Sequence, residues 1–390
     1  MTLPLATSSW DEKEYEAIQR VIESNHFTMG EEVKSFENEF AEYFGSKFAV
    51  MSNSGSSANL LAIAALFHSK KYDISVGDEV IVPAVSWSTT YYPLHQYGLK
   101  MKFVDIDLET LNLDLKKVEA AITDKTKMIM GVNLLGNPMN FEILADICER
   151  NSLILVEDNC ESMGAKFNGD YAGTFGVAGT FSSFFSHHIS TMEGGMTVTD
   201  SEELYQLMIS LRAHGWTRGL PVDNLIAEIS DDSFMESFRF ILPGYNLRPL
   251  EMSGAIGRAQ LKKLDSIIEG RRANAGEFKR MFSDIEGIRI QNEVGISSWF
   301  GFSMIIEDGS SRSELISLMK EAGIEVRPIV AGNFVRNPVI KLMDHTTCCD
   351  LLVADHVHDN GLFFGNHHYD ISKEIAEISD IVRDYMEERK

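Results

Sequence analysis

Residues 182–196 read Ser-Ser-Phe-Phe-Ser-His-His-Ile-Ser-Thr-Met-Glu-Gly-Gly-Met, and the rest of the chain is organised around this stretch. The β-prone run from Gly179 to Phe185 predicts a strand that brings two hydroxyls and a histidine pair to its end. Glu193 and the two glycines after it predict that the chain turns back there. Ligands bind at strand ends in open α/β sheets, because the loops there extend outward from a rigid support. We therefore expect a binding site in this stretch.

Strand-like and helix-like segments alternate on both sides of it. The expected strands are residues 48–51, 80–85, 102–107, 128–132 and 153–157, and the expected helices are residues 9–24, 58–67, 113–123, 141–151 and 202–213. This succession predicts a mainly parallel sheet with helices on both faces. A long helix over 252–282, strands over 288–291 and 298–306, and helices over 313–322 and 372–386 predict a smaller α+β part. The expected domains are 1–251, a large α/β domain, and 252–390, a smaller α+β domain.

Composition excludes several classes of function. The 390 residues include 35 basic and 58 acidic side chains, a net charge of −23 that argues against nucleic acid or an anionic membrane as partner. No segment approaches the ~18 unbroken apolar residues of a membrane span, and the N-terminus lacks a leader pattern, so we expect a cytoplasmic protein. The four cysteines form no pair of CxxC motifs, which predicts reduced structural thiols and no iron-sulfur cluster.

Three further strand ends carry polar or aromatic residues. Gly55 and Ser56 lie in a Ser/Gly turn between a strand and a helix, which is typical of a phosphate site and also of a simple helix cap. Trp87 follows the next strand, where a tryptophan packs either in the core or against a ligand. Asp158 follows a buried strand and can serve as a cap, a metal ligand or the partner of a cationic ring nitrogen. No histidine-rich ligand set accompanies it, so we expect no metal.

The central stretch resembles the cofactor-anchoring segment of the vitamin B6-dependent sugar aminotransferases. In that family a Ser lies five residues before a Lys, and Glu-Gly-Gly begins six residues after it. Counting forward from Ser182 and back from Glu193 gives the same position, His187. The chain thus looks like the dehydratase branch of the family, in which histidine replaces the lysine. The resemblance implies an aspartate aminotransferase-like fold, fold-type I, with a seven-stranded type of large sheet.

The resemblance also implies cofactor contacts. In the family the Ser/Gly turn binds the cofactor phosphate, an aromatic ring stacks on the pyridine ring, the Asp faces the ring nitrogen and the residue three further on touches the ring. The Asn of a Gly-Tyr-Asn-x-Arg signature, residues 244–248 here, reaches the cofactor phosphate of the partner subunit. The corresponding residues are Gly55, Ser56, Trp87, Asp158, Glu161, Ser182 and Asn246.

Substrate contacts are implied at other positions. The family's counterpart of His214 faces the amino-donor carboxylate, and that of Arg248 binds the glutamate carboxylate. Arg218, Glu325 and the loop His26, Phe27, Thr28 and Met29 correspond to positions near the nucleotide sugar. Each has a simpler interpretation: solvated loop residues for His214 and Arg218, apolar packing for the loop, and a strand-end salt bridge for Glu325.

No lysine lies between Lys166 and Lys262. Because imidazole cannot form a stable covalent imine with pyridoxal phosphate, we expect PLP or its amine form, PMP, to be bound noncovalently and to exchange. A histidine with an ordinary pKa of ~6.5 is still a capable base and acid near neutrality. The resemblance to the dehydratase branch implies that His187 serves removal of the C3 hydroxyl from a GDP-linked 4-keto-6-deoxy hexose, with L-glutamate regenerating PMP and ammonia released.

Two alternatives share most of these features. One is a nucleotide-sugar aminotransferase-like protein with altered or lost activity, and the other is a catalytically inactive regulatory binder. The Asn246 position predicts a homodimer with shared sites. For a histidine pair alone a structural role is the simpler interpretation, but the two spacings select His187. Adjacent residues of an extended segment point to opposite sides, so we expect only one of His187 and His188 to face the cofactor.

Overall fold

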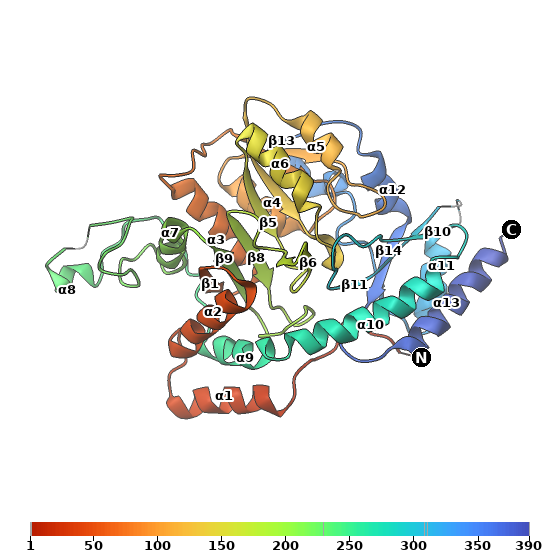
Figure 1. The fold of residues 1–390 in the computed structure, drawn as a ribbon, viewed down its shortest axis with the longest axis horizontal. Helices are drawn as coiled ribbons and strands as arrows, with labels where there is room; N and C mark the ends of the chain where they lie inside the picture. Colours follow the sequence, from red (N-terminus) through yellow and green to blue (C-terminus); the bar gives the residue numbers. More distant parts are fainter. Residues whose placement is uncertain (1, 229, 308, 310, 390) are drawn as a thin grey trace.

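An eight-stranded sheet forms the centre of the protein (Figure 1). The computed structural model describes residues 2–228, 230–307, 309 and 311–389. The strands lie in the order β1-β9-β8-β5-β4-β2-β3-β13; all neighbours from β13 to β8 are parallel, and β9 is antiparallel to β8 and β1. Their bounds are β1 (Phe48–Ser52), β2 (Glu79–Pro83), β3 (Lys100–Val104), β4 (Thr126–Val132), β5 (Ile154–Asp158), β8 (Ala178–Ser182), β9 (Gly195–Thr199) and β13 (His345–Thr347). The predicted mainly parallel α/β sheet is confirmed, with β13 as an eighth strand.

Helices cover both faces of this sheet, and strands β2, β8 and β9 are buried along their whole length. One core holds residues of α3 (Gly55–His68), α4 (Ser88–Gln96) and α7 (Glu202–Arg212), and another holds those of α5 (Leu115–Ala121) and α6 (Phe141–Asn151). Ser54, Asp114, Asn140 and Ser201 accept backbone N–H groups at the N-termini of four of these helices. These caps fix where each helix begins, and so they also fix which residues lie in the loop between a strand and the helix after it.

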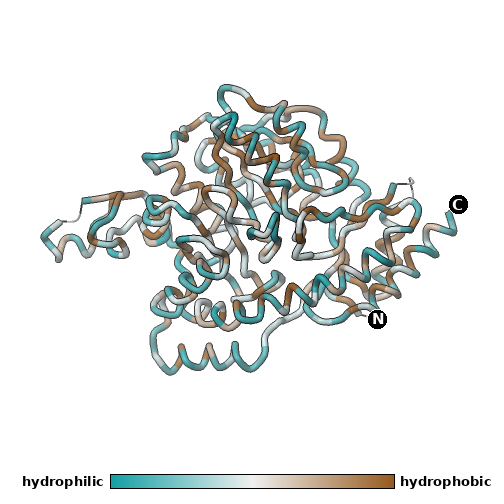
Figure 2. Tube along the Cα trace, in the orientation of Figure 1, coloured by the Kyte–Doolittle hydropathy of each residue, from teal (hydrophilic) through white to brown (hydrophobic). Residues whose placement is uncertain are grey.

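The N-terminal helix is shorter than predicted. It begins at Glu12 rather than residue 9, because Asp11 caps it and forms a capping box with Glu14: α1 (Glu12–Ser24). The next helix is α2 (Glu31–Phe44), whose first N–H groups bind the Glu251 carboxylate, with Gly30 N at 2.6 Å and Glu32 N at 2.7 Å. Figure 2 shows that hydrophobic residues concentrate on the central strands, whereas α1 is largely hydrophilic.

The predicted long helix over 252–282 is two helices, α9 (Glu251–Leu261) and α10 (Leu264–Phe282). The turn between them places Lys263 Nζ at 2.7 Å from Glu14 and 2.9 Å from Asp11.

The part of the chain after α10 forms a four-stranded sheet in the order β10-β11-β14-β12, with its own aromatic core of Phe278, Phe302 and Phe364. The remaining bounds are β10 (Ile288–Ile290), β11 (Gly301–Ile306), β12 (Val326–Arg327), β14 (Gly361–Gly365), α11 (Arg312–Glu321), α12 (Leu352–Asn360), α13 (Ser372–Glu387), η1 (Leu134–Gly136), η2 (Phe334–Arg336), η3 (Pro338–Leu342), β6 (Lys166–Phe167) and β7 (Asp170–Tyr171).

The packing does not follow a single cut at residue 251. Strand β13 pairs with β3 of the large sheet, and α9 packs against α1 and α2. In the other direction, Leu3 pairs with Ile324 and packs in the core of the smaller sheet. Residues from each predicted part therefore pack against the other part, and the domain boundary between 251 and 252 stays a prediction.

Residues 217–228 and 230–240, named the arm here, extend away from the body and carry α8 (Ser233–Glu236) (Figure 1). The arm exposes large apolar side chains, including Phe234 at 81% and Phe238 at 68%. Such a surface is unusual for a monomer in water and is typical of an interface. Among the described residues, no helix is long and apolar enough to cross a membrane.

Candidate active site

A cavity of about 360 Å³ lies at the carboxyl ends of the central strands. Its walls come from the ends of β5 and β8, the N-terminus of α3, the segment between β2 and α4, and the loop after β8. It brings together seven residues predicted from the sequence: Gly55, Ser56, Trp87, Asp158, Glu161, Ser182 and His187. A cofactor-sized molecule fits a space of this volume.

The N-terminus of α3 forms one end of the cavity. Ser54 caps the helix by accepting the Ser57 N–H at 3.0 Å, which confirms the cap interpretation and leaves the phosphate site a prediction. A Cβ added at Gly55 would lie 2.6 Å from Ser182 Cβ, so a side chain there would meet the wall that supplies the Ser182 hydroxyl. Free N–H groups of a helix N-terminus beside serine hydroxyls suit a phosphate group.

Asp158 lies at the floor of the cavity and is buried. Its Oδ2 accepts hydrogen bonds from Asn59 Nδ2 at 2.9 Å and Thr90 Oγ1 at 2.7 Å, and Oδ1 accepts the Cys160 N–H at 3.2 Å. Thr180 Oγ1 in turn donates to Asn59 Oδ1 at 2.6 Å. These bonds fix the carboxylate in one orientation, which suits a fixed cationic partner.

Sequence reasoning missed Asn59 and Thr90. Asn59 lies four residues after Gly55 on α3, so helical spacing places it on the same face as the phosphate turn, a signal that was available. Thr90 gave no such signal, because its hydrogen bond joins α4 to Asp158, which lies 68 residues further along the chain.

Trp87 and Glu161 form further walls. Trp87 is 58% exposed, so its interpretation as a core residue is wrong. Glu161 accepts the Leu135 N–H at 3.0 Å, and burial, together with the nearby Asp158 charge, raises the pKa of its carboxyl to about 7. A carboxyl with this pKa exchanges protons near neutrality.

His187 faces the cavity, and His188 lies behind it. The segment is not extended as predicted: the His187 N–H donates to Phe184 O at 2.9 Å and closes a turn. His188 is 1% exposed, and its Nε2 lies 3.1 Å from Ser298 O of the second half of the chain. His187 lines the cavity, and its catalytic role stays a prediction. The alternation argument was wrong, because both histidines lie in a turn and bend and not in an extended strand.

The electrostatics at His187 favour its neutral form. Burial, together with the charge of the Arg271 guanidinium, lowers the pKa of its imidazole to about 4. Nδ1 is buried and has no hydrogen-bond partner among the described residues, which leaves Nε2 as the nitrogen available to the cavity.

Other predicted residues lie outside this cavity within one chain. Thr28, Met29, Asn246 and Arg248 line a separate pocket, in which Arg248 Nε donates to Asn246 Oδ1 at 3.0 Å. His26 lines a different hollow beside Glu251.

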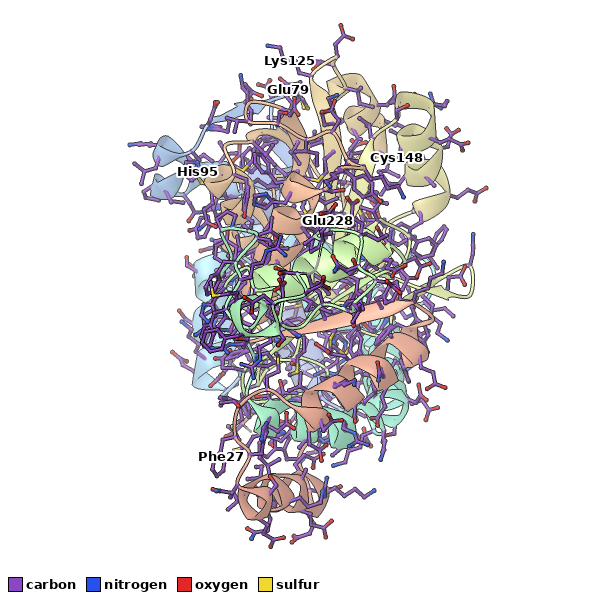
Figure 3. All side chains as sticks on the ribbon, turned by 90° about the vertical axis from the view of Figure 1, so that its left-hand side faces the viewer. Phe27, Glu79, His95, Lys125, Cys148 and Glu228 are labelled. Atoms are coloured by element: carbon purple, nitrogen blue, oxygen red, sulfur yellow. The ribbon has the colours of Figure 1, made fainter. Side chains whose placement is uncertain are left out.

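The last four predicted residues are also apart from the cavity. Phe27 lies beside α1 at the lower end of the molecule (Figure 3) and is 44% exposed. The His214 N–H donates to Tyr245 O at 2.6 Å, and Arg218 lies over the Trp216 ring at the base of the arm. Glu325 forms no strand-end salt bridge among the described contacts; its carboxylate accepts the Leu5 N–H at 3.2 Å.

Within the described residues, no group of three or more His, Cys, Asp or Glu side chains is arranged to hold a metal ion. Cys148, Cys160, Cys348 and Cys349 form no disulfide.

Comparison with known proteins gives consistent matches over nearly the whole chain. Residues 8–383 match the DegT/DnrJ/EryC1/StrS aminotransferase family. The chain is 59% identical over 387 residues to GDP-4-keto-6-deoxy-D-mannose 3-dehydratase of Yersinia pseudotuberculosis, covering 98% of each chain. Two crystal structures of GDP-4-keto-6-deoxymannose-3-dehydratase, one with a trapped PLP-glutamate geminal diamine and one a mutant with bound GDP-perosamine, are each 56% identical with a TM-score of 0.96. Each comparison covers 98% of this chain and 100% of the other.

Proposed function

The chain belongs to the DegT/DnrJ/EryC1/StrS aminotransferase family, and from this membership we propose that it is a PLP- and PMP-dependent dehydratase. It removes the C3 hydroxyl of GDP-4-keto-6-deoxy-D-mannose to give GDP-4-keto-3,6-dideoxy-D-mannose. L-glutamate regenerates PMP and becomes 2-oxoglutarate, and ammonia is released. The observation that carries the proposal is His187, which faces the cavity at the position of the family's lysine.

No lysine lines the cavity, and none lies between Lys166 and Lys262 in the sequence. An imidazole cannot hold the cofactor aldehyde covalently. We infer that PLP and PMP are held by noncovalent contacts alone and exchange with solvent.

The residues present fit this cofactor. The α3 N-terminus with Gly55, Ser56 and Ser182 would hold its phosphate, and Trp87 would stack on its ring. Asp158, fixed by Asn59 and Thr90, would pair with the protonated ring nitrogen. When bound, the cofactor supplies an amine that joins the sugar's keto carbon and a ring that accepts electrons.

His187 moves the protons of the reaction. Its neutral imidazole takes a proton from the cofactor carbon next to the amine, and the resulting imidazolium returns a proton to the departing C3 oxygen. One side chain therefore serves as base and then as acid. Because the side chain carries no primary amine, it does not complete an amino transfer as lysine does.

The substrate-binding roles follow the sequence predictions and stay proposals. Arg248 binds the glutamate carboxylate, assisted by His214, and Arg218, Glu325 and residues 26–29 lie near the nucleotide sugar. A guanidinium suits a carboxylate because it donates two parallel hydrogen bonds. None of these side chains lines the His187 cavity of the same chain, so the complete site needs a second subunit.

We propose a homodimer for this reason. The arm exposes Phe234, Phe238 and Phe240, and Asn246 and Arg248 lie in a pocket away from the cofactor cavity. A two-fold axis would let each chain supply these residues to its partner. The cytoplasmic location expected from the sequence also stays a prediction.

The test is incubation of the protein with PLP, L-glutamate and GDP-4-keto-6-deoxy-D-mannose, followed by mass spectrometry. Loss of one oxygen atom from the sugar with no nitrogen gained supports the proposal. An amino sugar product would instead identify an aminotransferase. An unchanged sugar, in a protein shown to bind it, would identify an inactive binder.

A further inference from the structure

Four polar side-chain atoms with no hydrogen-bond partner lie in one region behind the cavity. They are Nδ1 of His187, Nδ1 of His188, Nε of Arg271 and Oγ of Ser298, and all are buried. Buried polar atoms are normally satisfied, so a concentration of exceptions at one place calls for a reason. All four residues meet at the segment 298–300, which enters from the second half of the chain.

Arg271 holds this segment. It is 6% exposed, lies on α10, and donates to Phe300 O at 3.0 Å and Trp299 O at 3.5 Å. It forms no ion pair among the described residues; its guanidinium binds only carbonyl oxygens. A buried cation without a carboxylate is costly, so its retention favours a role in the site.

Phe300 connects Arg271 to the histidines. Its ring centroid lies 5.1 Å from that of His187 and 5.8 Å from that of His188. Its N–H donates to Leu135 O at 3.0 Å, and the Leu135 N–H binds Glu161 of the cavity wall. The Phe300 backbone is therefore held on one side by Leu135 and on the other by Arg271, which keeps its ring beside the two histidines.

The surroundings of His187 differ from those of most acid–base histidines. Such a histidine commonly donates its second N–H to a carboxylate, which stabilises the protonated ring. Here the second nitrogen has no partner, and the nearby charge is a guanidinium. The other titratable groups around the ring are His188 beside it and Asp158, Cys160, Glu161 and Glu193 across the cavity.

We propose that Arg271 and Phe300 are a positioning pair for His187: Arg271 fixes the Phe300 backbone, and the Phe300 ring fixes the imidazole plane. The buried guanidinium behind this ring also disfavours the imidazolium. This inference rests on the proposed function for its catalytic consequence. Expulsion of a C3 hydroxyl needs a strong acid, and an imidazolium destabilised by a cation gives up its proton more readily. The resting enzyme keeps His187 neutral and ready to act first as a base.

The proposal is tested on the protein without cofactor, by NMR titration of histidines labelled with ¹³C at the ring. His187→Asn identifies the His187 signal. Arg271→Gln removes the charge but keeps a donor for the carbonyls, and we expect it to raise the His187 titration midpoint by about one pH unit. Arg271→Lys keeps the charge, and its midpoint should stay near that of the natural protein.

Arg272→Gln is the matched control. Arg272 is the next residue on α10, but it binds Glu293 and Ser297 O, so its loss should leave the midpoint unchanged. Phe300→Leu should lower kcat at least about tenfold with little change in KM, because the ring contacts His187 rather than the sugar.

A midpoint that does not move in Arg271→Gln, or that moves as far in Arg271→Lys or Arg272→Gln, would overturn the role of the charge. An unchanged kcat in Phe300→Leu would overturn the role of the ring. Because the titration requires no turnover, it gives its answer even when the protein fails the dehydratase assay. Failure of the proposed function and failure of this inference are therefore separable.

Discussion

Asn59 and Asp158 are joined by a 2.9 Å hydrogen bond across 99 residues of sequence. The bond directs one carboxylate oxygen toward the protein and, with the Thr90 hydroxyl, leaves the other side of the group for the cavity. This fixed carboxylate suits the proposed pairing of Asp158 with a cationic ring nitrogen.

Asp158→Asn should weaken PLP binding by about 1.5–3 kcal/mol, since a charge-assisted hydrogen bond to the ring nitrogen is replaced by a neutral one. The measurement is an absorbance titration of the protein with PLP. Asp170→Asn, in the exposed hairpin of β7, is the control and should bind PLP normally. Equal affinity in both variants would remove Asp158 from the cofactor site.

Gly55→Ala should destabilise the protein by about 1–3 kcal/mol and reduce PLP affinity, because the new methyl group meets Ser182 Cβ at 2.6 Å. Gly276→Ala is the matched control: that glycine lies within α10 with no atom within 4 Å of the added Cβ. It should be stabilising by about 0.5–1 kcal/mol. Urea denaturation measures both, and a Gly55→Ala protein as stable as the control would contradict the close approach.

His187 and His188 should respond differently to substitution. His187→Asn should abolish formation of the 3-deoxy sugar while cofactor and sugar still bind, and His187→Lys should give a covalent cofactor adduct that borohydride traps. The natural protein should keep its polypeptide mass after borohydride treatment, as measured by mass spectrometry.

His188→Asn should reduce activity much less than His187→Asn, because His188 binds a backbone carbonyl away from the cavity. An inactive His188→Asn with a near-normal His187→Asn would reverse the assignment.

The part of the stability of the cofactor-free protein that comes from Glu157 and Glu161 should fall as the pH rises from about 5 to about 7, whereas the buried His187, His188 and His367, whose pKa values are lowered, contribute in the opposite direction. Burial raises the pKa of Glu157 and of Glu161 to about 7, so the folded state binds more protons than the unfolded state in this window. Stability contributed by the protonated carboxyls is present at low pH and is lost as the pH reaches 7. Glu161→Gln should remove the Glu161 contribution, so that stability falls less or rises more with pH in thermal unfolding scans than in the natural protein, whereas Glu142→Gln on the exposed face of α6 should leave the pH dependence unchanged. An identical slope in both variants would show that Glu161 does not titrate in this way.

Phe234→Asp should weaken the homodimer, because it places a charge on the most exposed phenylalanine of the arm. Sedimentation velocity across a concentration series would detect the shift toward monomer. Val76→Asp is the control, since Val76 is 72% exposed but lies in the loop before β2, outside the arm. A natural protein that is monomeric and active at working concentration would refute the dimer.

The sequence by itself determined where the central strands β1, β2, β3, β4, β5 and β8 lie and the identity of the residue at the lysine position, but it did not predict α2, α4, β9 or β13. A buried strand is marked by a short apolar run, which can be read within one segment of the chain. The spacing from Ser182 and Glu193 to His187 can also be counted directly along the sequence. The seven predicted residues of the cavity follow strand ends or open a helix. A parallel sheet collects such positions at one edge, so they could be predicted together.

The tertiary structure alone decided the contacts that orient these groups. The break between α9 and α10 has no glycine or proline to mark it; the Lys263 turn is held by Glu14 and Asp11 from the N-terminal helix. Likewise, Thr90 reaches Asp158, and Arg271 and Phe300 reach His187, only because separate elements pack together. Local periodicity records which face of an element is buried, but it does not record which distant element covers that face, so these partners appear only once the chain is folded.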